Sequence, residues 1–163
     1  MEDYSLNTKW CLWFHSLNNT SWNKNSYKLL LKLSNIYDLK ILNDIILKNH
    51  LQNGMFFIMR ENIFPTWEDP ENRNGSCVSY KISGNSLHDD WCFMVNNIVT
   101  EDILINSKDY NGINGLSISP KKEFNILKIW LRENYENKSI KKIIKSYDPN
   151  FIESKAKIRK HEI

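Results

Sequence analysis

Two tryptophans in polar segments are the residues of this chain that best fit a chemical role. Trp22 lies in Asn18-Asn-Thr-Ser-Trp-Asn-Lys-Asn25, and Trp67 lies in Pro65-Thr-Trp-Glu-Asp-Pro70. A tryptophan in a polar or proline-bounded loop is not placed like a core residue, so we expect both indoles to be available to a ligand. Together they predict a slot for a flat ring. The negative quadrupole of each indole face favours a ring that is also a cation.

A carboxylate beside the slot narrows the choice of ring. Guanine methylated at its seventh nitrogen is a planar cation, and Glu68 directly follows Trp67. Its carboxylate can accept charge-assisted hydrogen bonds from the N–H groups of guanine, which selects against adenine. Each stack or bond contributes about 1–3 kcal/mol. Two indoles and one carboxylate therefore predict micromolar affinity or better, at about −8 kcal/mol, with nearby lysines holding phosphates.

Motifs for catalysis or metal binding are absent from the sequence. It has no Gly-rich phosphate loop, no GxSxG and no HExxH, and it contains five glycines in all. Cys11, Cys77 and Cys92 form no CxxC pair, and the four histidines have no metal-ligand spacing with them. We therefore predict a binding protein rather than an enzyme, with no catalytic residues, no metal site, no disulfide framework and no cofactor.

Length and composition indicate one intracellular domain. The 163 residues are 41% apolar, and no apolar run approaches the roughly 20 residues of a membrane helix. The first residues are acidic and polar, unlike a secretory signal. A net charge of +3 is too small for wrapping long nucleic acid. We expect a cytoplasmic, soluble protein with no membrane partner, a single domain over 1–163, and mobile tails at 1–8 and 156–163.

The hydrophobic pattern predicts an α+β fold. Strands are expected at 9–15, 27–33, 55–59 and 76–82, a hairpin at 113–119 and 123–132, and a last strand at 150–154. A helix capped by Ser34 or Asn35 should reach Leu51. A second should follow a Ser86–Asp89 capping box, and a third should cover 140–147. Such elements predict an antiparallel sheet covered by three helices on one face, with the other face free for a ligand.

Four segments carry a family resemblance. They are Trp10-Cys-Leu-Trp-Phe14, Ser21-Trp22, Asn62-Ile-Phe-Pro-Thr-Trp-Glu-Asp69 and Ile129-Trp130. In this order and approximate spacing they resemble the eukaryotic translation initiation factor 4E family of messenger-RNA cap-binding proteins. The resemblance runs from about Trp10 to Trp130 and on through the helix predicted at 140–147. It implies a curved antiparallel sheet with three α-helices on its convex face, and a 7-methylguanosine cap bound in the concave mouth.

The resemblance also implies roles for single residues. Trp22 and Trp67 match the two stacking tryptophans, with the Trp67 backbone N–H bonding the guanine carbonyl oxygen. Glu68 matches the carboxylate that reads the guanine edge, and Trp130 matches the tryptophan that touches the N7-methyl group. Lys121 falls where the family places a phosphate-binding arginine.

Three other family positions carry different residues here. The second phosphate-binding lysine of the family falls on Ile126, so Lys122 or Lys128 would have to replace it. Lys128 shares a strand face with Ile126 and Trp130 by the two-residue repeat. A basic residue usual in the family falls near Cys77, and a usual asparagine falls on Ser119. The resemblance therefore implies a phosphate site that is rebuilt or weaker.

The convex face differs from the family as well. The family binds initiation factor 4G there through a helix anchored on a tryptophan, and that position falls on Leu39. Another contact position falls on Cys92 or Phe93. Three functions stay open: an initiation factor that delivers capped mRNA, a cap-binding repressor or decoy that does not recruit initiation factor 4G, and an enzyme acting on caps. The abundance of Asn, Ile and Lys fits a divergent homologue of the family, such as one from a virus.

Overall fold

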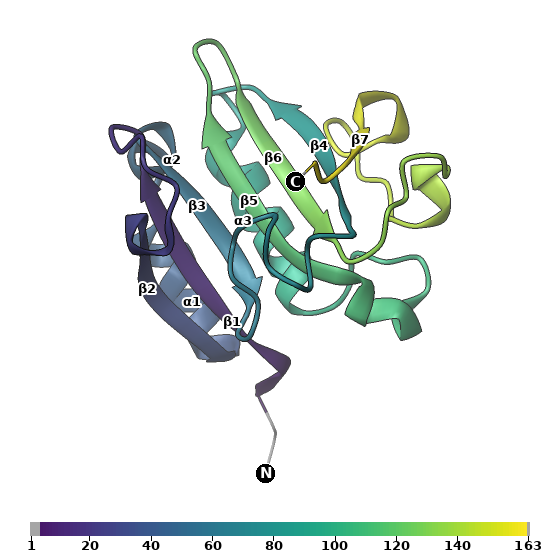
Figure 1. Ribbon diagram of the computed structural model, residues 1–163, viewed down its shortest axis with the longest axis horizontal. Helices are drawn as coiled ribbons and strands as arrows, with labels where there is room; N and C mark the ends of the chain where they lie inside the picture. Colours follow the sequence, from purple (N-terminus) through teal and green to yellow (C-terminus); the bar gives the residue numbers. More distant parts are fainter. Residues whose placement is uncertain (1–3, 163) are drawn as a thin grey trace.

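A curved, seven-stranded antiparallel sheet organises the protein. The computed structural model describes residues 4–162, which contain seven strands and three α-helices. In chain order these are β1 (Ser5–Ser16), β2 (Tyr27–Asn35), α1 (Ile36–Ile45), α2 (Lys48–Gln52), β3 (Gly54–Arg60), β4 (Ser76–Ile82), α3 (Leu87–Val99), β5 (Ile113–Pro120), β6 (Asn125–Leu131) and β7 (Lys157–Lys160). The strand order is β2-β1-β3-β5-β6-β4-β7, so β2 and β7 form the two edges (Figure 1).

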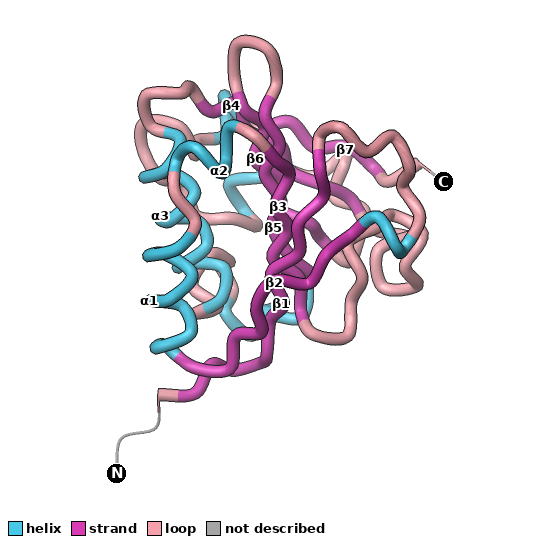
Figure 2. The backbone as a smooth tube through the Cα atoms, turned by 90° about the vertical axis from the view of Figure 1, so that its left-hand side faces the viewer, coloured by secondary structure: helices cyan, strands magenta, loops and turns pink. Residues whose placement is uncertain are grey.

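The helices cover one face of the sheet and leave the other to loops (Figure 2). The arrangement confirms the predicted α+β fold, with three α-helices on the convex face. None of the helices within the described residues is both long enough and apolar enough to cross a membrane.

Strand β3 shows how the two faces separate. Phe56 and Ile58 join the large core beneath the helices, whereas Phe57 and Met59 join a smaller apolar cluster on the concave face. Successive side chains of a strand point to opposite faces, so a continuous apolar run is needed where both faces are covered. The strand predicted at 55–59 is confirmed, and residues 56–59 are buried on both of its faces.

Two of the predicted helices form, at α1 and at α3. The apolar residues of α3 that recur at helical spacing are all fully buried, namely Leu87, Trp91, Met94, Val95 and Ile98. Ser86 precedes this helix, but its hydroxyl bonds the Asp90 carboxylate at 2.7 Å, so the predicted capping box with Asp89 does not form. Asn35 caps α1 as expected, accepting the Asp38 N–H at 3.0 Å.

The helical stretch that was expected to reach Leu51 divides at Ile46 and Leu47 into α1 and α2. Side chains bond the backbone groups at the break. The Ile46 carbonyl oxygen lies 2.9 Å from His88 Nε2, and the Leu47 N–H donates to His50 Nδ1 at 2.9 Å. Because these bonds replace those of a continuous helix, the chain turns here without leaving polar groups unpaired.

The third predicted helix, at 140–147, is wrong. The segment makes a 3-10 turn at Ile140–Lys142, and its backbone then pairs with another segment. Ile105 donates its N–H to Ile143, and Lys145 donates to Ile103, each at 2.9 Å. Ile140 and Ile144 are nonetheless buried, as the apolar pattern requires. Tertiary pairing here outweighs the helical pattern.

The strand predicted near the end of the chain is also wrong. The segment 150–154 is not a strand but leads into a 3-10 turn at Glu153–Lys155. Part of each segment predicted as a mobile tail lies in the sheet: Ser5–Thr8 begins β1, and Lys157–Lys160 forms β7 against β4, while residues 1–3 and 163 lie outside the described residues. Ala156 and Ile158 pack against the core, so the charged end alternates apolar and basic side chains as an edge strand does.

Candidate functional site

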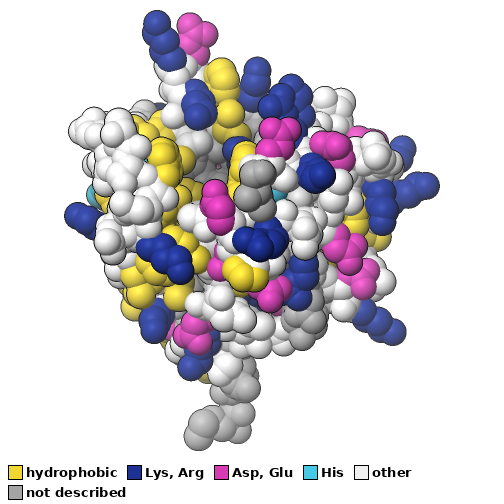
Figure 3. Space-filling view, in the orientation of Figure 1, with side chains coloured by type: hydrophobic (Ala, Val, Ile, Leu, Met, Phe, Trp, Pro, Cys, Tyr) yellow, Lys and Arg dark blue, Asp and Glu magenta, His cyan; other side chains and the backbone are white. Residues whose placement is uncertain are grey.

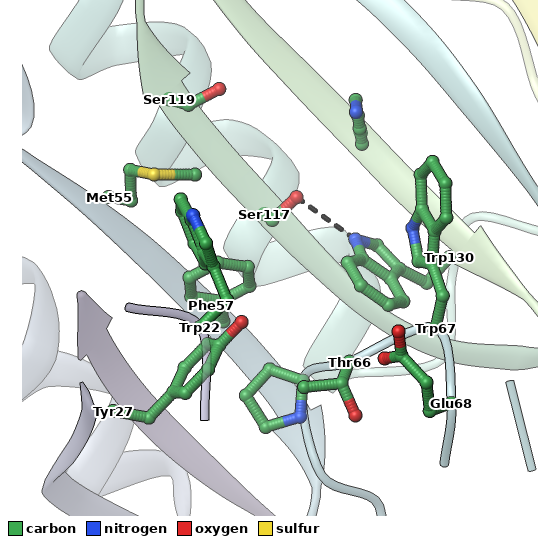
Figure 4. A pocket seen from close by; sticks show the side chains of 12 residues that line it. Trp22, Tyr27, Met55, Phe57, Thr66, Trp67, Glu68, Ser117, Ser119 and Trp130 are labelled. Carbon is green, nitrogen blue, oxygen red and sulfur yellow. Dashed lines mark hydrogen bonds between the residues drawn. The ribbon is translucent and has the colours of Figure 1, made fainter. Parts of the chain in front are cut away.

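A cavity of about 440 Å³ opens on the concave face, within the size range of small-molecule sites. Its lining includes all four residues predicted to hold the base of the ligand. The lining residues are Trp22, Tyr27, Met55, Phe57, Pro65, Thr66, Trp67, Glu68, Ser117, Ser119, Lys128 and Trp130. Figure 4 shows Trp22 and Tyr27 on one side of the cavity, with Trp67, Glu68 and Trp130 on the other. Figure 3 shows the hollow on this face, bordered by hydrophobic side chains.

The Trp22 side of the cavity, which we call the Trp22 wall, is built from residues close in sequence. The Trp22 indole stacks on the His15 ring, with centroids 3.9 Å apart and planes 7° from parallel. His15 is fully buried, and its ring nitrogens lie 2.9 Å from the Ser16 and Ser21 carbonyl oxygens. Trp22 itself is 53% exposed. One face of the indole therefore rests on a fixed ring, while the side chain stays open to solvent.

The Trp67 side, the Trp67 wall, stands on the loop between β3 and β4. Asp69 accepts the N–H groups of Phe64 and Glu71 at 2.9 Å each, closing the loop on itself. The buried Asn72 side chain donates to the carbonyl oxygens of Phe64 and Thr66 at 3.1 and 2.9 Å. The polar residues that made this segment look like a flexible loop are therefore its internal scaffold.

A histidine from the end of the chain backs Trp67. The His161 ring lies nearly parallel to the Trp67 indole, at 13° and 5.4 Å between centroids, and also contacts Trp130. It is only 2% exposed. Its backbone N–H donates to the Gly75 carbonyl at 3.0 Å. The strand β7 thus delivers His161 to the base of the Trp67 loop.

The hydrogen bonds of His161 fix its protonation. Its Nδ1 lies 2.6 Å from the Asn72 carbonyl oxygen, which can only accept, so Nδ1 carries the proton. Its Nε2 then accepts the thiol proton of Cys77 at 2.9 Å. Burial lowers the pKa of His161, with Lys128 adding to the effect. Burial also raises the pKa of the Cys77 thiol to about 12. A neutral imidazole and a protonated thiol are the matching states of this pair.

Trp130 lies between the walls on β6. Its side chain is buried, and its indole N–H donates to the Ser117 hydroxyl at 2.9 Å (Figure 4). The ring meets Phe57 edge to face at 6.3 Å. Lys128 lines the cavity from the same face of β6, as the two-residue repeat predicted, with its Nζ 5.9 Å from the Trp67 ring centroid. The cavity therefore combines aromatic surface with a nearby cation.

Glu68 is exposed at the mouth of the cavity, and its backbone carbonyl accepts a bond from Arg73 at 3.2 Å. The charge of its carboxylate also acts on Tyr27, on the opposite side of the cavity. Burial raises the pKa of Tyr27 to about 12, and the Glu68 carboxylate contributes to that rise. Negative charge thus lies at the mouth of a cavity that also receives the Lys128 cation from β6.

Three predicted site residues lie away from the cavity. Lys121 and Lys122 are exposed at the tip of the β5–β6 hairpin, where the Lys121 N–H donates to Phe124, and they line a separate depression. Leu39, the predicted partner anchor, is 7% exposed because it faces the core from α1. The exposed aromatic side chain of α1 is Tyr37, at 61%.

Other functional positions had weak signals in the sequence. His15 and His161 lacked a metal-ligand pattern, and nothing in their spacing indicated stacking on a tryptophan 7 or 94 residues away. Tyr27 and Ser117 sit in ordinary strand patterns. Only the alternation of β5 and β6 places Ser117 on the same face as Lys128, its partner in the register.

The fold and the cavity together define a class of protein, in which an antiparallel sheet is covered by helices on one face and carries an aromatic cavity on the other. The chain belongs to the eukaryotic initiation factor 4E family, whose model matches residues 5–160. The predicted family is therefore confirmed, and the match extends beyond the segment on which the prediction was based.

Individual relatives agree with this assignment. A eukaryotic translation initiation factor 4E homolog of Acanthamoeba polyphaga mimivirus is 26% identical over 140 residues, covering 73% of this chain. The chain spans about half of that relative, 52% of its length. The fold resembles Schistosoma eIF4E solved with m7GpppA and 4E-BP, with a TM-score of 0.75 and 17% identity. That match covers 87% of this chain and 79% of the Schistosoma chain. It also resembles C. elegans eIF4E-3 solved with Mextli and a cap analog, with a TM-score of 0.73 and 19% identity. That match covers 82% of this chain and 77% of the C. elegans chain.

Proposed function

We propose that this protein binds the 7-methylguanosine cap of mRNA by stacking the base between Trp22 and Trp67. One observation carries the proposal: two accessible indoles, each resting on a buried histidine ring, line a single cavity beside a carboxylate. Indoles whose positions are already fixed lose little conformational freedom on binding. Two negative ring faces favour the cationic, methylated base over unmethylated guanine.

The remaining residues divide the other contacts. Glu68 accepts the guanine N–H groups, and the Trp67 backbone N–H donates to the guanine carbonyl oxygen. Trp130 offers a buried apolar surface to the N7-methyl group. Lys128 reaches the first phosphates from β6, and the hairpin lysines, Lys121 and Lys122, reach those farther out. The Cys77 position contributes no charge, because its thiol is buried against His161.

Titration of tryptophan fluorescence tests cap binding. We expect quenching by m7GTP at micromolar concentration or below, and affinity for GTP lower by at least tenfold, because the unmethylated base is neutral. Equal quenching by the two nucleotides would overturn the proposal. Incubation with capped RNA and Mg²⁺ or Mn²⁺ tests the absence of catalysis, and any release of the cap would contradict a pure binding role.

The convex face supports a second part of the proposal, a protein partner. Its exposed apolar side chains gather on α1 and the following turn: Ile36, Tyr37, Ile41, Ile45 and Leu47. An amphipathic partner helix needs such anchors. The structures similar to this fold include complexes with the 4E-binding proteins Mextli and 4E-BP. We propose that a helix of this kind binds here, on Tyr37 rather than on Leu39.

Binding of an initiation factor 4G helix separates the two cap-binding roles. A complex formed below about ten micromolar, and lost in Tyr37→Ala, would indicate an initiation factor. No binding at tens of micromolar would instead favour a repressor or decoy that holds capped mRNA without recruiting the initiation complex.

A further inference from the structure

The concave face carries a set of basic side chains that begins in the cavity and continues outside it. They are Lys128 on β6, Lys81 on β4, and Lys157 and Arg159 on β7. We call these four residues the basic strip. Only Lys128 lines the cavity. The other three lie on β4 and β7, the strands that follow β6 toward one edge of the sheet (Figure 1).

The strand register places the strip on one face. Directly paired residues of antiparallel strands point to the same side of a sheet. Ser79 pairs with Lys128 on β6 and with Lys157 on β7. Cys77 pairs with Trp130 and with Arg159 in the next row. Lys157 and Arg159 therefore share the concave face with Trp130 and Lys128. Two strand spacings, about 10 Å, separate β6 from β7.

The strip is available to an anion. Lys81, Lys157 and Arg159 are exposed. Among the ion pairs within residues 4–162, none involves a side chain of the strip. The acidic groups near β7 are engaged elsewhere or lie beyond the strip: Glu153, before the strand, pairs with Lys141 at 3.8 Å, Glu136 accepts the Lys160 N–H at 3.1 Å, and Glu162 follows the strand. Exposed cations on fixed strands, without carboxylate partners, suit a polyanion.

We propose that the basic strip binds the phosphate backbone of the RNA nucleotides that follow the cap, guiding the chain over β4 and β7. The inference rests on the proposed cap binding, because Lys128 belongs both to the cavity and to the strip. A path with phosphates spaced along it needs successive cations, which the cross-strand rows supply. Phosphate contacts carry no base information, so the strip binds RNA of any sequence.

A charge-removal variant tests the strip without touching the cavity. Lys157→Gln/Arg159→Gln removes two cations from β7. The matched control, Lys40→Gln/Lys48→Gln, removes two exposed cations from α1 and α2 on the opposite face. Three probes are titrated: m7GTP, a capped RNA ten nucleotides long, and the same RNA uncapped. Thermal unfolding of both variants checks that the sheet is intact.

We expect the β7 variant to bind m7GTP within twofold of the unaltered protein. Its affinity for capped RNA should fall on the order of tenfold, and its salt slope should shrink by about 1.4, or 0.7 for each lost contact. The control should change neither value. Equal affinity of both variants for capped RNA would overturn the strip, as would an equal loss for m7GTP and capped RNA.

The three probes distinguish failure of the cap-binding proposal from failure of the basic-strip proposal. If m7GTP fails to bind the unaltered protein, cap binding is wrong; the strip then stands only if the β7 variant weakens binding of uncapped RNA. If a polyglutamate peptide displaces capped RNA as readily as polyuridine of the same length does, the strip recognises acidic protein, and the RNA proposal is overturned.

Discussion

Both walls of the cavity support a tryptophan on a histidine ring, but the two histidines come from different distances along the chain. Each indole rests on a buried histidine ring: Trp22 on His15, and Trp67 on His161. The Trp22 wall is local, since His15 lies seven residues before its tryptophan and bonds backbone carbonyls of the same turn. The Trp67 wall is assembled from afar, because His161 comes from the last strand and lies 94 residues beyond the indole that it supports.

The difference has a consequence for folding and binding. A local wall forms whenever β1 and β2 pair. The Trp67 wall requires β7 to dock on β4, and β7 is a short edge strand of four residues. Edge elements with few contacts open at lower free energy than central strands. We therefore expect the position of Trp67, rather than that of Trp22, to respond to changes at the end of the chain.

The largest effect should come from removing an indole. Trp67→Ala and Trp22→Ala should each weaken m7GTP binding by about 1–3 kcal/mol, or roughly 5- to 150-fold, because each removes one stack. Isothermal titration calorimetry measures both, since fluorescence would lose one of its reporters.

Trp67→Phe and Trp22→Phe are the matched controls, because they keep a ring while reducing its area and should lose less affinity. Unchanged retention of either alanine variant on a cap-analogue resin would remove that tryptophan from the site.

The second effect compares the histidines directly. His161→Ala should weaken m7GTP binding about three- to tenfold through the displaced Trp67. It should also reduce the free energy of unfolding by about 1–3 kcal/mol, because the Asn72 carbonyl loses its buried partner. Hydrogen exchange should rise across the loop 61–75 but not across the turn that carries Trp22. Urea titration and deuterium exchange measure these changes.

His161→Phe separates the stacking ring from its hydrogen bonds. If stacking positions Trp67, the phenyl ring should restore much of the cap affinity while the stability stays reduced. His15→Ala is the reciprocal variant, and its increase in exchange should stay at the Trp22 turn. A His161→Ala protein with full cap affinity would show that Trp67 holds its place without β7.

The same contrast explains what could be predicted from the sequence. Trp22, Trp67, Glu68 and Trp130 were identified because their types and order are specific, and strands such as Ser76–Ile82 were found from local alternation. The failures are long-range. The backbone of 140–147 pairs with residues 103–105 instead of forming a helix, and His161 gains its role only through β7.

Charge also misled the interpretation of the last residues. The segment 156–163 was predicted as a mobile tail, although Ala156 and Ile158 alternate with its basic residues at the period of a strand. Leu39 was placed by counting along the family, and only the helix face shows that it points inward and that Tyr37 points outward. The buried face of a helix and the pairing of a strand both depend on the elements packed against them, and the local sequence does not show which elements those are.

A smaller effect is expected at the rim. Glu68→Gln should weaken m7GTP binding by about 1–2 kcal/mol without changing stability, because it removes the charge from the bonds to guanine. Discrimination between m7GTP and 7-methylated ATP should fall as well, because affinity and discrimination both depend on the hydrogen bonds that Glu68 accepts from the edge of the base. Competition binding with the two nucleotides provides the measurement. Glu71→Gln, in the same loop but outside the cavity, is the control. Equal affinity of Glu68→Gln and the unaltered protein would show that Glu68 does not read the base.

The smallest effect is a pH dependence confined to the Trp67 wall. The pKa of His161 is lowered from 6.5 in the folded protein, so the unfolded chain binds the proton more readily. The stability from the neutral ring is therefore fully present above about pH 6.5 and is lost as the pH falls toward the lowered value. The free energy of unfolding should drop between pH 7.5 and 5.5, and the drop should be smaller in His161→Phe. Other groups titrate in both proteins, so the difference between the two urea-unfolding curves isolates His161. Identical curves would mean that the imidazole is not held neutral between Asn72 and Cys77, and that the Trp67 wall does not depend on its protonation.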